Sequence, residues 1–462
     1  MKILIVSNLY PPHYVGGYEI RCALVADGLR KAGHEVRVLT TRFGLDRRDP
    51  VEDEVNGVRI QRVLGQYNLG PQDTVGWPYF LNMVRPQLRD ANNFSRIIDE
   101  FKPDLVNWWS VRGLTKAILP IPKLRGIPDV FCVEEAWLTE ERERDQLDER
   151  PAWAGLWARD GKRWYWRPLL LWLMERWKGR LLKQGIDTTP ISFSPTHVCF
   201  VSEFLRTHFR VAGFDFPSTE VIYGGVAVAK FFCRREKCVG NQQLVRFLYA
   251  GQIDPERGLH TAIEALSLLS QEARFIARLT VAGDSFDSNY QRRVRELARV
   301  LGLSEIVMFI GKKTYQDMPE IYRSHDVLIS PSLRKEGLPL SMVEAMLSGC
   351  AVVTTGSGGA IEIAQLADLP LFPKGDAVAL SRILESLIGN RQTLEQIASR
   401  GQNVALREFS SDRMMERFLI TFQNLYEKTQ KKELQQAGDA QDDNSVRFIA
   451  PGEHKDPNAS PA

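Results

Sequence analysis

Residues 326–353 read Asp326-Val-Leu-Ile-Ser-Pro-Ser-Leu-Arg-Lys-Glu336-Gly337-Leu338-Pro-Leu-Ser-Met-Val-Glu344-Ala-Met-Leu-Ser-Gly349-Cys-Ala-Val-Val353. The pattern predicts a strand, a loop that carries an acid and a glycine, a helix with a second acid near its start, and another strand. In open α/β sheets, ligands bind at the carboxyl ends of the strands, where loops and helix N-termini meet. We therefore expect Glu336 and Glu344 to face a ligand, and carboxylates suit the hydroxyl groups of a polyhydroxylated one.

Both acids also have plain structural explanations. Ser341 precedes Glu344 by three residues, so the two could form a capping box that only closes the start of the helix. Glu336 could be a solvated loop acid, since two glutamates eight residues apart often occur by chance. The spacing by itself leaves these alternatives open.

The same alternation of strands and helices extends through the second half of the chain. Further strands are predicted over residues 245–250, 277–282, 306–310 and 351–354, and helices over 259–270 and 289–301. Two more helices are expected to reach about residue 407. This pattern predicts a Rossmann-like domain over residues 233–408 with a parallel, doubly wound sheet.

The first half of the chain shows the pattern as well. Strands are predicted over residues 2–7, 34–41, 105–109, 129–133, 197–201 and 220–223, and a helix from about residue 20 to Gly33. Asn56-Gly57 is typical of a hairpin turn at a sheet edge. A polar, basic stretch over 233–243 marks the predicted end of a first domain, residues 1–232.

The last part of the chain is predicted to form one helix and a tail. Met414, Phe418, Phe422 and Tyr426 recur at fourfold spacing, which indicates a helix over residues 409–428 with one apolar stripe. Residues 429–462 are polar, and we expect them to be a disordered tail.

Composition excludes several classes of protein. The 462 residues are 44% hydrophobic and 25% charged, as in ordinary globular proteins, and the net charge of +3 is too small for a dedicated nucleic-acid binder. The first residues lack the pattern of a signal peptide, and the densest apolar run, residues 169–174, is too short to cross a bilayer. The 6 cysteines are scattered, which favours free thiols in a reducing compartment. We expect a cytoplasmic protein.

The quoted stretch resembles the most recognisable motif of the family 4 glycosyltransferases (glycosyl transferases group 1), retaining enzymes of the GT-B fold. Glu336, Gly337, Pro339, the run from Glu344 to Met346, and Gly349 all match that motif. The resemblance implies that Glu336 and the backbone amides of Gly337 and Leu338 hold the donor sugar. It also implies that Glu344 holds the ribose of the nucleotide.

The resemblance covers most of residues 1–427 and implies a donor-phosphate site. Tyr249-Ala-Gly-Gln252-Ile-Asp-Pro-Glu-Arg257-Gly258 resembles the loop where relatives place an arginine and a lysine on the donor diphosphate, but here Gln252 and Arg257 stand in those places. A guanidinium there would stabilise the departing diphosphate, whereas Gln252 donates only a neutral hydrogen bond. We therefore expect either slower turnover or compensation by another cation. Arg257 could also merely lie along a helix start.

In the first half, Gly16 and Gly17 resemble the family's glycine-rich loop near the donor phosphates, where glycines allow close approach of the backbone. Gly224 stands where the family usually has asparagine. Glu134 stands where relatives carry a histidine beside the acceptor. It could serve as a carboxylate base for the acceptor hydroxyl, or it could form a surface ion pair with nearby arginines.

Two other features bear on partners. The sequence contains no Asp-x-Asp, and its His and Cys residues lack ligand spacing, so we expect no metal and no cofactor besides the nucleotide diphosphate sugar that is the substrate. Residues 159–183 combine basic side chains with four tryptophans, which suits peripheral contact with the inner face of a membrane. A helix packed on its own domain, with cations reaching to solvent, explains them as well. Nucleic acid is not expected as a partner.

The resemblance implies a GT-B architecture: two Rossmann-like domains facing each other across a cleft, with the final helix returning to the first domain. It also implies retaining, metal-independent transfer of a hexose from a nucleotide diphosphate sugar to a saccharide or lipid-linked acceptor, in polysaccharide or glycoconjugate biosynthesis. Glu336, Arg257 and Glu134 are the candidate catalytic residues. Gly16, Gly17, Gln252, Gly337, Leu338 and Glu344 complete the candidate donor site. A sugar-nucleotide epimerase of the same fold and a non-catalytic nucleotide-sugar-binding protein are the alternatives.

Overall fold

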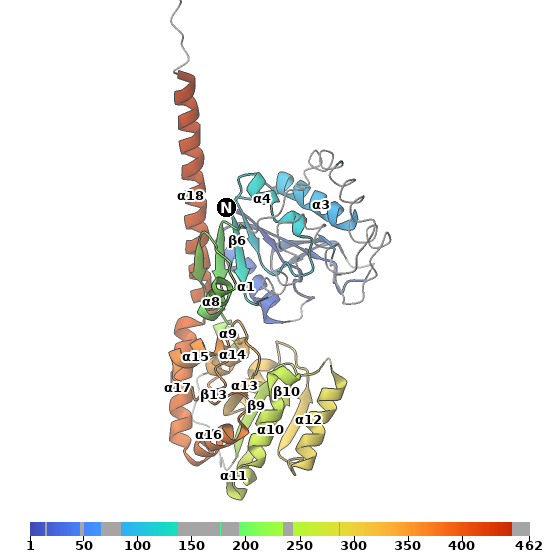
Figure 1. Cartoon of the computed structure of the whole chain (residues 1–462), viewed down its shortest axis with the longest axis vertical. Coiled ribbons are helices and arrows are strands. Elements are labelled where there is room, and N and C mark those ends of the chain that lie inside the picture. The colour runs from blue at the N-terminus through green and yellow to red at the C-terminus, as the bar shows by residue number, and fades with distance from the viewer. Residues whose placement is uncertain are drawn as a thin grey trace, which may run out of the picture. The chain divides into compact units, whose positions relative to one another are not determined.

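The computed structural model describes residues 1–13, 16–46, 50–65, 85–136, 176, 194–233, 244–285 and 287–445 (Figure 1). The chain divides into two units, residues 1–419, which hold both β-sheets, and residues 420–462, which hold most of the last helix. Within the described ranges, no helix combines the length and the apolar character that a membrane span requires.

The first half of the chain builds one sheet, which has eight strands among the described residues. The strands are β1 (Lys2–Val6), β2 (Glu35–Thr41), β3 (Glu52–Val55), β4 (Val58–Leu64), β5 (Leu105–Trp108), β6 (Asp129–Val133), β7 (His197–Phe200) and β8 (Thr219–Val221). Their order is β3-β4-β2-β1-β5-β6-β7-β8, and all neighbours are parallel except β3 and β4. Asn56 and Gly57 both have positive φ and join those two strands as the predicted edge hairpin.

Helices cover this sheet because each has one apolar stripe to bury. They are α1 (Gly17–Lys31), α3 (Arg85–Phe101), the 3₁₀ turn η2 (Lys116–Ile118), α4 (Ile121–Leu124) and α8 (Glu203–Val211). The short helix α9 (Val228–Phe231) packs instead against α14 (Leu340–Leu347) of the second half. Trp108 of β5 lies fully buried between the rings of Phe94 and Phe131, with both ring centroids 5.5 Å away. The stack joins α3 to two central strands.

The second half builds a separate, fully parallel sheet of five strands in the part of the chain that is described. The strands are β9 (Val245–Ala250), β10 (Ala277–Ala282), β11 (Val307–Gly311), β12 (Val327–Ser330) and β13 (Ala351–Thr354), in the order β11-β10-β9-β12-β13. The predicted strands 245–250, 277–282, 306–310, 326–330 and 351–354 are confirmed to within one residue at each end.

The helices around the second sheet are more numerous than the sequence predicted. They are η3 (Pro255–Arg257), α10 (Leu259–Ser267), α11 (Gln271–Ile276), α12 (Ser288–Val300), α13 (Met318–Arg323), α14 (Leu340–Leu347), α15 (Ala360–Ala367), α16 (Ala377–Gly389) and α17 (Arg391–Glu408). Figure 1 shows them surrounding the strands, and α14 packs against α17. Three helices, not two, follow β13, because the eight-residue α15 is too short for its periodicity to stand out in the sequence.

After α17 the chain returns to the first half. The Val226 N–H donates to the Phe409 carbonyl, and the Ser411 N–H donates to the Val226 carbonyl, each at 2.9 Å. The final helix α18 (Ser411–Ser445) then begins, and its Phe418 ring lies 6.2 Å from that of Trp109. The predicted return of this helix to the first domain is confirmed.

The predicted disordered tail was wrong over residues 429–445, which continue α18. These residues are polar, but most of them, such as Lys, Glu, Gln and Ala, favour helix, and no proline interrupts them. Residues 446–462 lie outside the described part of the chain. The domain boundary at 232/233 stays a prediction, although the strands change sheets between β8 and β9.

Candidate donor and acceptor site

The predicted donor residues gather where the order of the second sheet changes direction. The first strand of that sheet, β9, lies between β10 and β12, so the loops after β9 and β12 meet at the position where doubly wound sheets bind ligands. The Leu333 and Arg334 N–H groups donate to the Glu256 carbonyl at 2.8 and 3.1 Å. These bonds tie the loop after β12 to η3.

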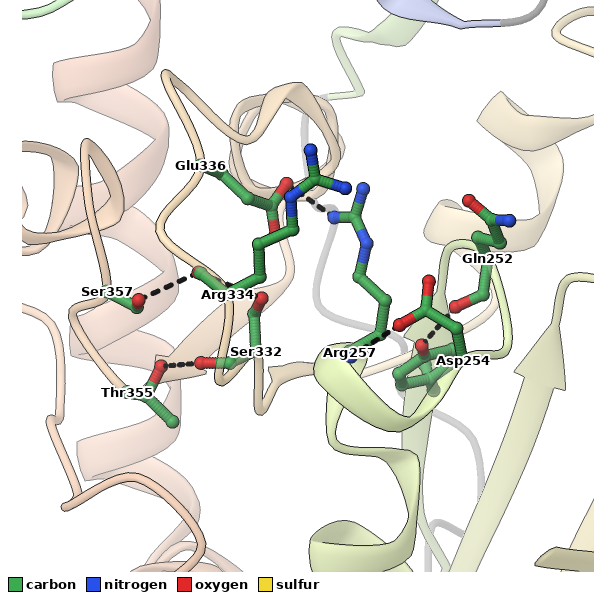
Figure 2. A network of polar contacts seen from close by, with 9 residues as sticks. Gln252, Asp254, Arg257, Ser332, Arg334, Glu336, Thr355 and Ser357 are labelled. Carbon is green, nitrogen blue, oxygen red and sulfur yellow. Dashed lines mark hydrogen bonds and ion pairs between the residues drawn. The ribbon is translucent and has the colours of Figure 1, made fainter. Parts of the chain in front are cut away.

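Arg257 and Glu336 form an ion pair across these two loops. A terminal nitrogen of Arg257 lies 2.5 Å from Oε2 of Glu336, and the Asp254 carboxylate accepts from the Arg257 N–H at 2.9 Å (Figure 2). Burial opposes the charge on Arg257, yet the Glu336 carboxylate raises the pKa of the guanidinium above its ordinary value. Nε of Arg257 is buried and has no hydrogen-bond partner among the described residues. The pair therefore keeps a donor available for an anion.

Hydroxyl groups from the next loop hold the backbone before Glu336. Ser357 donates to the Arg334 carbonyl at 2.7 Å, and Thr355 donates to the Ser332 carbonyl at 2.6 Å (Figure 2). The Gly359 N–H donates to the Glu336 carbonyl at 2.8 Å. Because so many of its carbonyls are bonded, this loop is anchored although it has no regular structure.

Gly337 brings the loop against the first half of the chain. A Cβ at this position would collide with the carbonyl oxygen of Glu134 and crowd the Leu205 side chain. The following residue, Leu338, is buried. Only glycine permits this approach, which places the backbone of Glu134 beside the predicted donor-sugar amides.

Glu344 does not form the capping box that Ser341 would require. Helix α14 has Pro339 as its N-cap, without a side-chain cap, so Ser341 lies inside the first turn. The Glu344 carboxylate is buried and accepts from the Tyr322 hydroxyl at 2.9 Å. Burial raises its pKa to about 7. A buried carboxylate with one donor still has acceptor capacity for ligand hydroxyls.

Glu134 forms an ion pair, but the pair is buried and not on the surface as the sequence suggested. Its carboxylate contacts Arg21 of α1, and the two side chains are 6% and 5% exposed. Burial raises the pKa of Glu134 to about 7, although Arg21 acts in the opposite direction. Nε and Nη1 of Arg21 lack hydrogen-bond partners within the described ranges. A Cβ at Gly224 would collide with Nη1 of Arg21, so glycine at that position leaves room for the guanidinium.

The remaining predicted residues take different positions. The Gly16 N–H donates to the Glu19 carboxylate at 3.0 Å at the start of α1, and a Cβ on Gly17 would lie 3.1 Å from Leu340 of α14. The glycine-rich loop is thus close to the start of α14. The carbonyl of Gln252 accepts from the Tyr249 hydroxyl at 2.6 Å, and among the described residues no hydrogen bond joins Gln252 to Glu336 (Figure 2).

Sequence reasoning did not single out Arg21, Tyr322, Arg334 or Glu362. Arg21 has a weak signal, since it stands beside Cys22 on a helix whose other buried residues are mostly apolar. Tyr322 bonds to Glu344, which lies 22 positions away in the sequence, a pairing that no local pattern reveals.

The basic segment 159–183 lies outside the described residues apart from Arg176. In the described part of the chain, no group of three or more His, Cys, Asp or Glu side chains could hold a metal ion.

Comparisons with known proteins agree with this arrangement. A family model described as "Glycosyltransferase Family 4" matches residues 15–230, and one described as "Glycosyl transferases group 1" matches residues 235–404. An uncharacterised glycosyltransferase of Methanocaldococcus jannaschii is 24% identical over 397 residues, which is 82% of this chain and 87% of that protein. The lipopolysaccharide 1,2-N-acetylglucosaminetransferase of Salmonella typhimurium is 27% identical over 39% of this chain and 49% of its own length.

The fold also matches solved structures. The sucrose-phosphate synthase of Thermosynechococcus elongatus superposes with a TM-score of 0.65 at 18% identity, covering 92% of this chain and 99% of that one. At this identity the match establishes the fold alone, and the fold is GT-B, as the sequence predicted. With both halves matched in order by the two family models, the chain belongs to the family 4 glycosyltransferases.

Proposed function

We propose that this glycosyltransferase moves a sugar from a nucleotide diphosphate sugar to a hydroxyl of a saccharide or lipid-linked acceptor, with retention at the anomeric carbon and without a metal ion. The single observation that carries the proposal is the ion pair of Arg257 and Glu336 at the switch point of the second sheet. It places a guanidinium for a diphosphate next to a carboxylate for sugar hydroxyls.

Each site residue has a role in this reaction. The bond between the anomeric carbon and the diphosphate oxygen breaks, and its electron pair stays on that oxygen, where Arg257 stabilises the charge. The acceptor oxygen bonds to the face that the leaving group vacates, and its proton passes to the diphosphate. Glu336 and the amides of Gly337 and Leu338 orient the sugar, and the buried carboxylate of Glu344 accepts from the ribose hydroxyls.

Glu134 lies on the side of the first domain that would hold the acceptor. Its backbone approaches Gly337, and its carboxylate is paired with Arg21. That carboxylate can accept a hydrogen bond from the acceptor hydroxyl and orient it, while the proton itself passes to the diphosphate. The relative that acts on lipopolysaccharide supports an acceptor of the saccharide or glycolipid class.

The first test is the thermal shift of the purified protein with UDP-, GDP-, ADP- and dTDP-sugars in the presence of a chelator. A ligand that binds only the folded state raises the melting temperature. We expect one nucleotide class to give a shift that Glu344→Ala abolishes and that the exposed control Glu305→Ala retains. No shift with any donor, from a folded protein, would contradict the proposal.

The preferred donor is then incubated with and without candidate acceptors. Transfer with an anomeric configuration equal to that of the donor, read by NMR, supports the retaining reaction. An altered sugar nucleotide formed without acceptor would indicate an epimerase instead. Binding without turnover across the acceptor panel would indicate a non-catalytic binding protein.

A further inference from the structure

The backbone of Arg334 is attached to the turn that carries Arg257. Its N–H donates to the Glu256 carbonyl at 3.1 Å, one residue before Arg257. Its own carbonyl accepts from the hydroxyls of Ser357 at 2.7 Å and Ser332 at 3.3 Å. These bonds fix the point from which the Arg334 side chain starts, so its direction follows from the fold of the site.

That side chain points toward Arg257 and Glu336. Figure 2 shows the two arginine side chains rising from different loops toward the same carboxylate. Glu336 is already paired with Arg257, and among the described residues no acid forms an ion pair with Arg334. Two guanidinium groups therefore lie near the Glu336 carboxylate, while a second acid, Asp254, accepts from the backbone N–H of Arg257.

Such an arrangement favours an anion with more than one charge. Like charges brought together repel, and a ligand that accepts from both removes that repulsion. Planar guanidinium groups suit phosphate oxygens because each can donate two parallel hydrogen bonds. The unpartnered Nε of Arg257 adds one more donor.

We propose that Arg334 is a second diphosphate-binding residue, which acts with Arg257 and supplies the cation that Gln252 does not. The proposal rests on the proposed function, because it takes the donor diphosphate as the anion. It makes the loop after β12 a two-part donor site, with Glu336 for the sugar and Arg334 for the phosphates. Lys335, also exposed and next in the chain, provides a matched control of equal charge.

The test compares the dissociation constants of a nucleoside diphosphate and of its monophosphate, measured by calorimetry for UDP with UMP, GDP with GMP, ADP with AMP and dTDP with dTMP. For the pair that binds the wild type, we expect Arg334→Ala to weaken the diphosphate about tenfold and the monophosphate by much less, since a charge-assisted bond to the second phosphate is lost. Lys335→Ala should change both by less than about twofold. Because the Arg334 side chain is exposed, the variants should keep the melting temperature of the wild type.

A second variant tests the link to position 252. Gln252→Arg in the Arg334→Ala background should restore most of the diphosphate affinity, because it returns a cation to the loop after β9. The inference would be overturned if Arg334→Ala and Lys335→Ala weakened diphosphate binding equally, or if Arg334→Ala weakened the diphosphate and the monophosphate equally. Either result would leave the proposed function standing. A wild type that binds none of the four diphosphates would overturn the proposed function, and the inference with it.

Discussion

Glu344 is a carboxyl group enclosed by the protein, with the Tyr322 hydroxyl as its hydrogen-bond donor. Its pKa is about 7 in the folded protein because burial disfavours the charged form, against 4.5 for a free glutamate. Between these values the folded state keeps a proton that the unfolded state has lost. The free energy of unfolding therefore falls as pH rises from about 4.5 to about 7.

Glu344→Gln should remove that part of the pH dependence. Over this interval, we expect the free energy of unfolding of the wild type to fall by up to about 3 kcal/mol more than that of the variant. Urea denaturation at pH 5, 6 and 7 without ligand measures the difference. Glu134 has a raised pKa of the same sign, so a slope remains in the variant. Equally steep curves for both proteins would show that Glu344 does not titrate in this range.

The close approach at Gly337 gives a second prediction at the scale of single residues. Gly337→Ala would force apart the loop and the Glu134 carbonyl, and we expect a loss of about 1–3 kcal/mol together with most of the transfer activity. Gly389→Ala, at the end of α16, is the control, because no atom lies within 4 Å of its added Cβ. The control should keep both stability and activity. If the two substitutions behave alike in denaturation and in assays, the crowding at Gly337 is not significant.

Among the helices, α8 is held at its start by two acceptors from different parts of the chain. The Ser202 hydroxyl accepts from the Leu205 N–H at 3.2 Å, as an N-cap. The Glu362 carboxylate of α15 accepts from the Glu203 and Phe204 N–H groups at 2.9 and 2.6 Å. One acid thus satisfies two N–H groups that would otherwise lack partners, and its charge suits a helix N-terminus.

Replacement of Glu362 should therefore destabilise the protein more than replacement of the N-cap residue Ser202. We expect Glu362→Ala to lower the free energy of unfolding by about 2 kcal/mol and Ser202→Ala by about 1 kcal/mol. Glu362→Gln should retain part of the stability, because its amide oxygen still accepts. Glu395→Ala, an exposed acid on α17, serves as the control in the same denaturation series. A larger loss of stability for Ser202→Ala than for Glu362→Ala would contradict the role of Glu362 at the start of α8.

The central strands were predicted well because each is a short apolar run bounded by turn residues, and a parallel sheet buried on both faces demands that pattern. Helix α15 and the second half of α18 were missed because the first is short and the second lacks apolar periodicity. The expected roles of Glu336 and Glu344 came from one contiguous motif, and that of Arg257 came from a second one at residues 249–258. The bond from Tyr322 to Glu344 and the pairing of Arg21 with Glu134 depend on contacts that only the folded chain creates.

At the scale of the whole molecule, α18 has an apolar part followed by a polar part. Met414 and Phe418 are 3% and 4% exposed, whereas the described side chains after Thr429, such as Leu434, are exposed. Termination after Thr429 should leave the melting temperature within about 2 °C of the full chain and preserve transfer activity. Termination after Ser411 should give an unstable protein, because it removes both buried residues. A melting temperature that falls with the first truncation would assign the polar part a structural role.

The hydroxyl bonds from Thr355 and Ser357 to the loop before Glu336 have a practical consequence for engineering. They couple two loops, so we expect substitutions at 355 and 357 to shift the backbone that carries Arg334 and Glu336. Libraries designed to change donor preference should therefore randomise these two positions alongside the direct contacts. Under the proposed function, we expect graded changes in selectivity from variation there, whereas replacement of Glu336 would remove a proposed direct contact with the sugar.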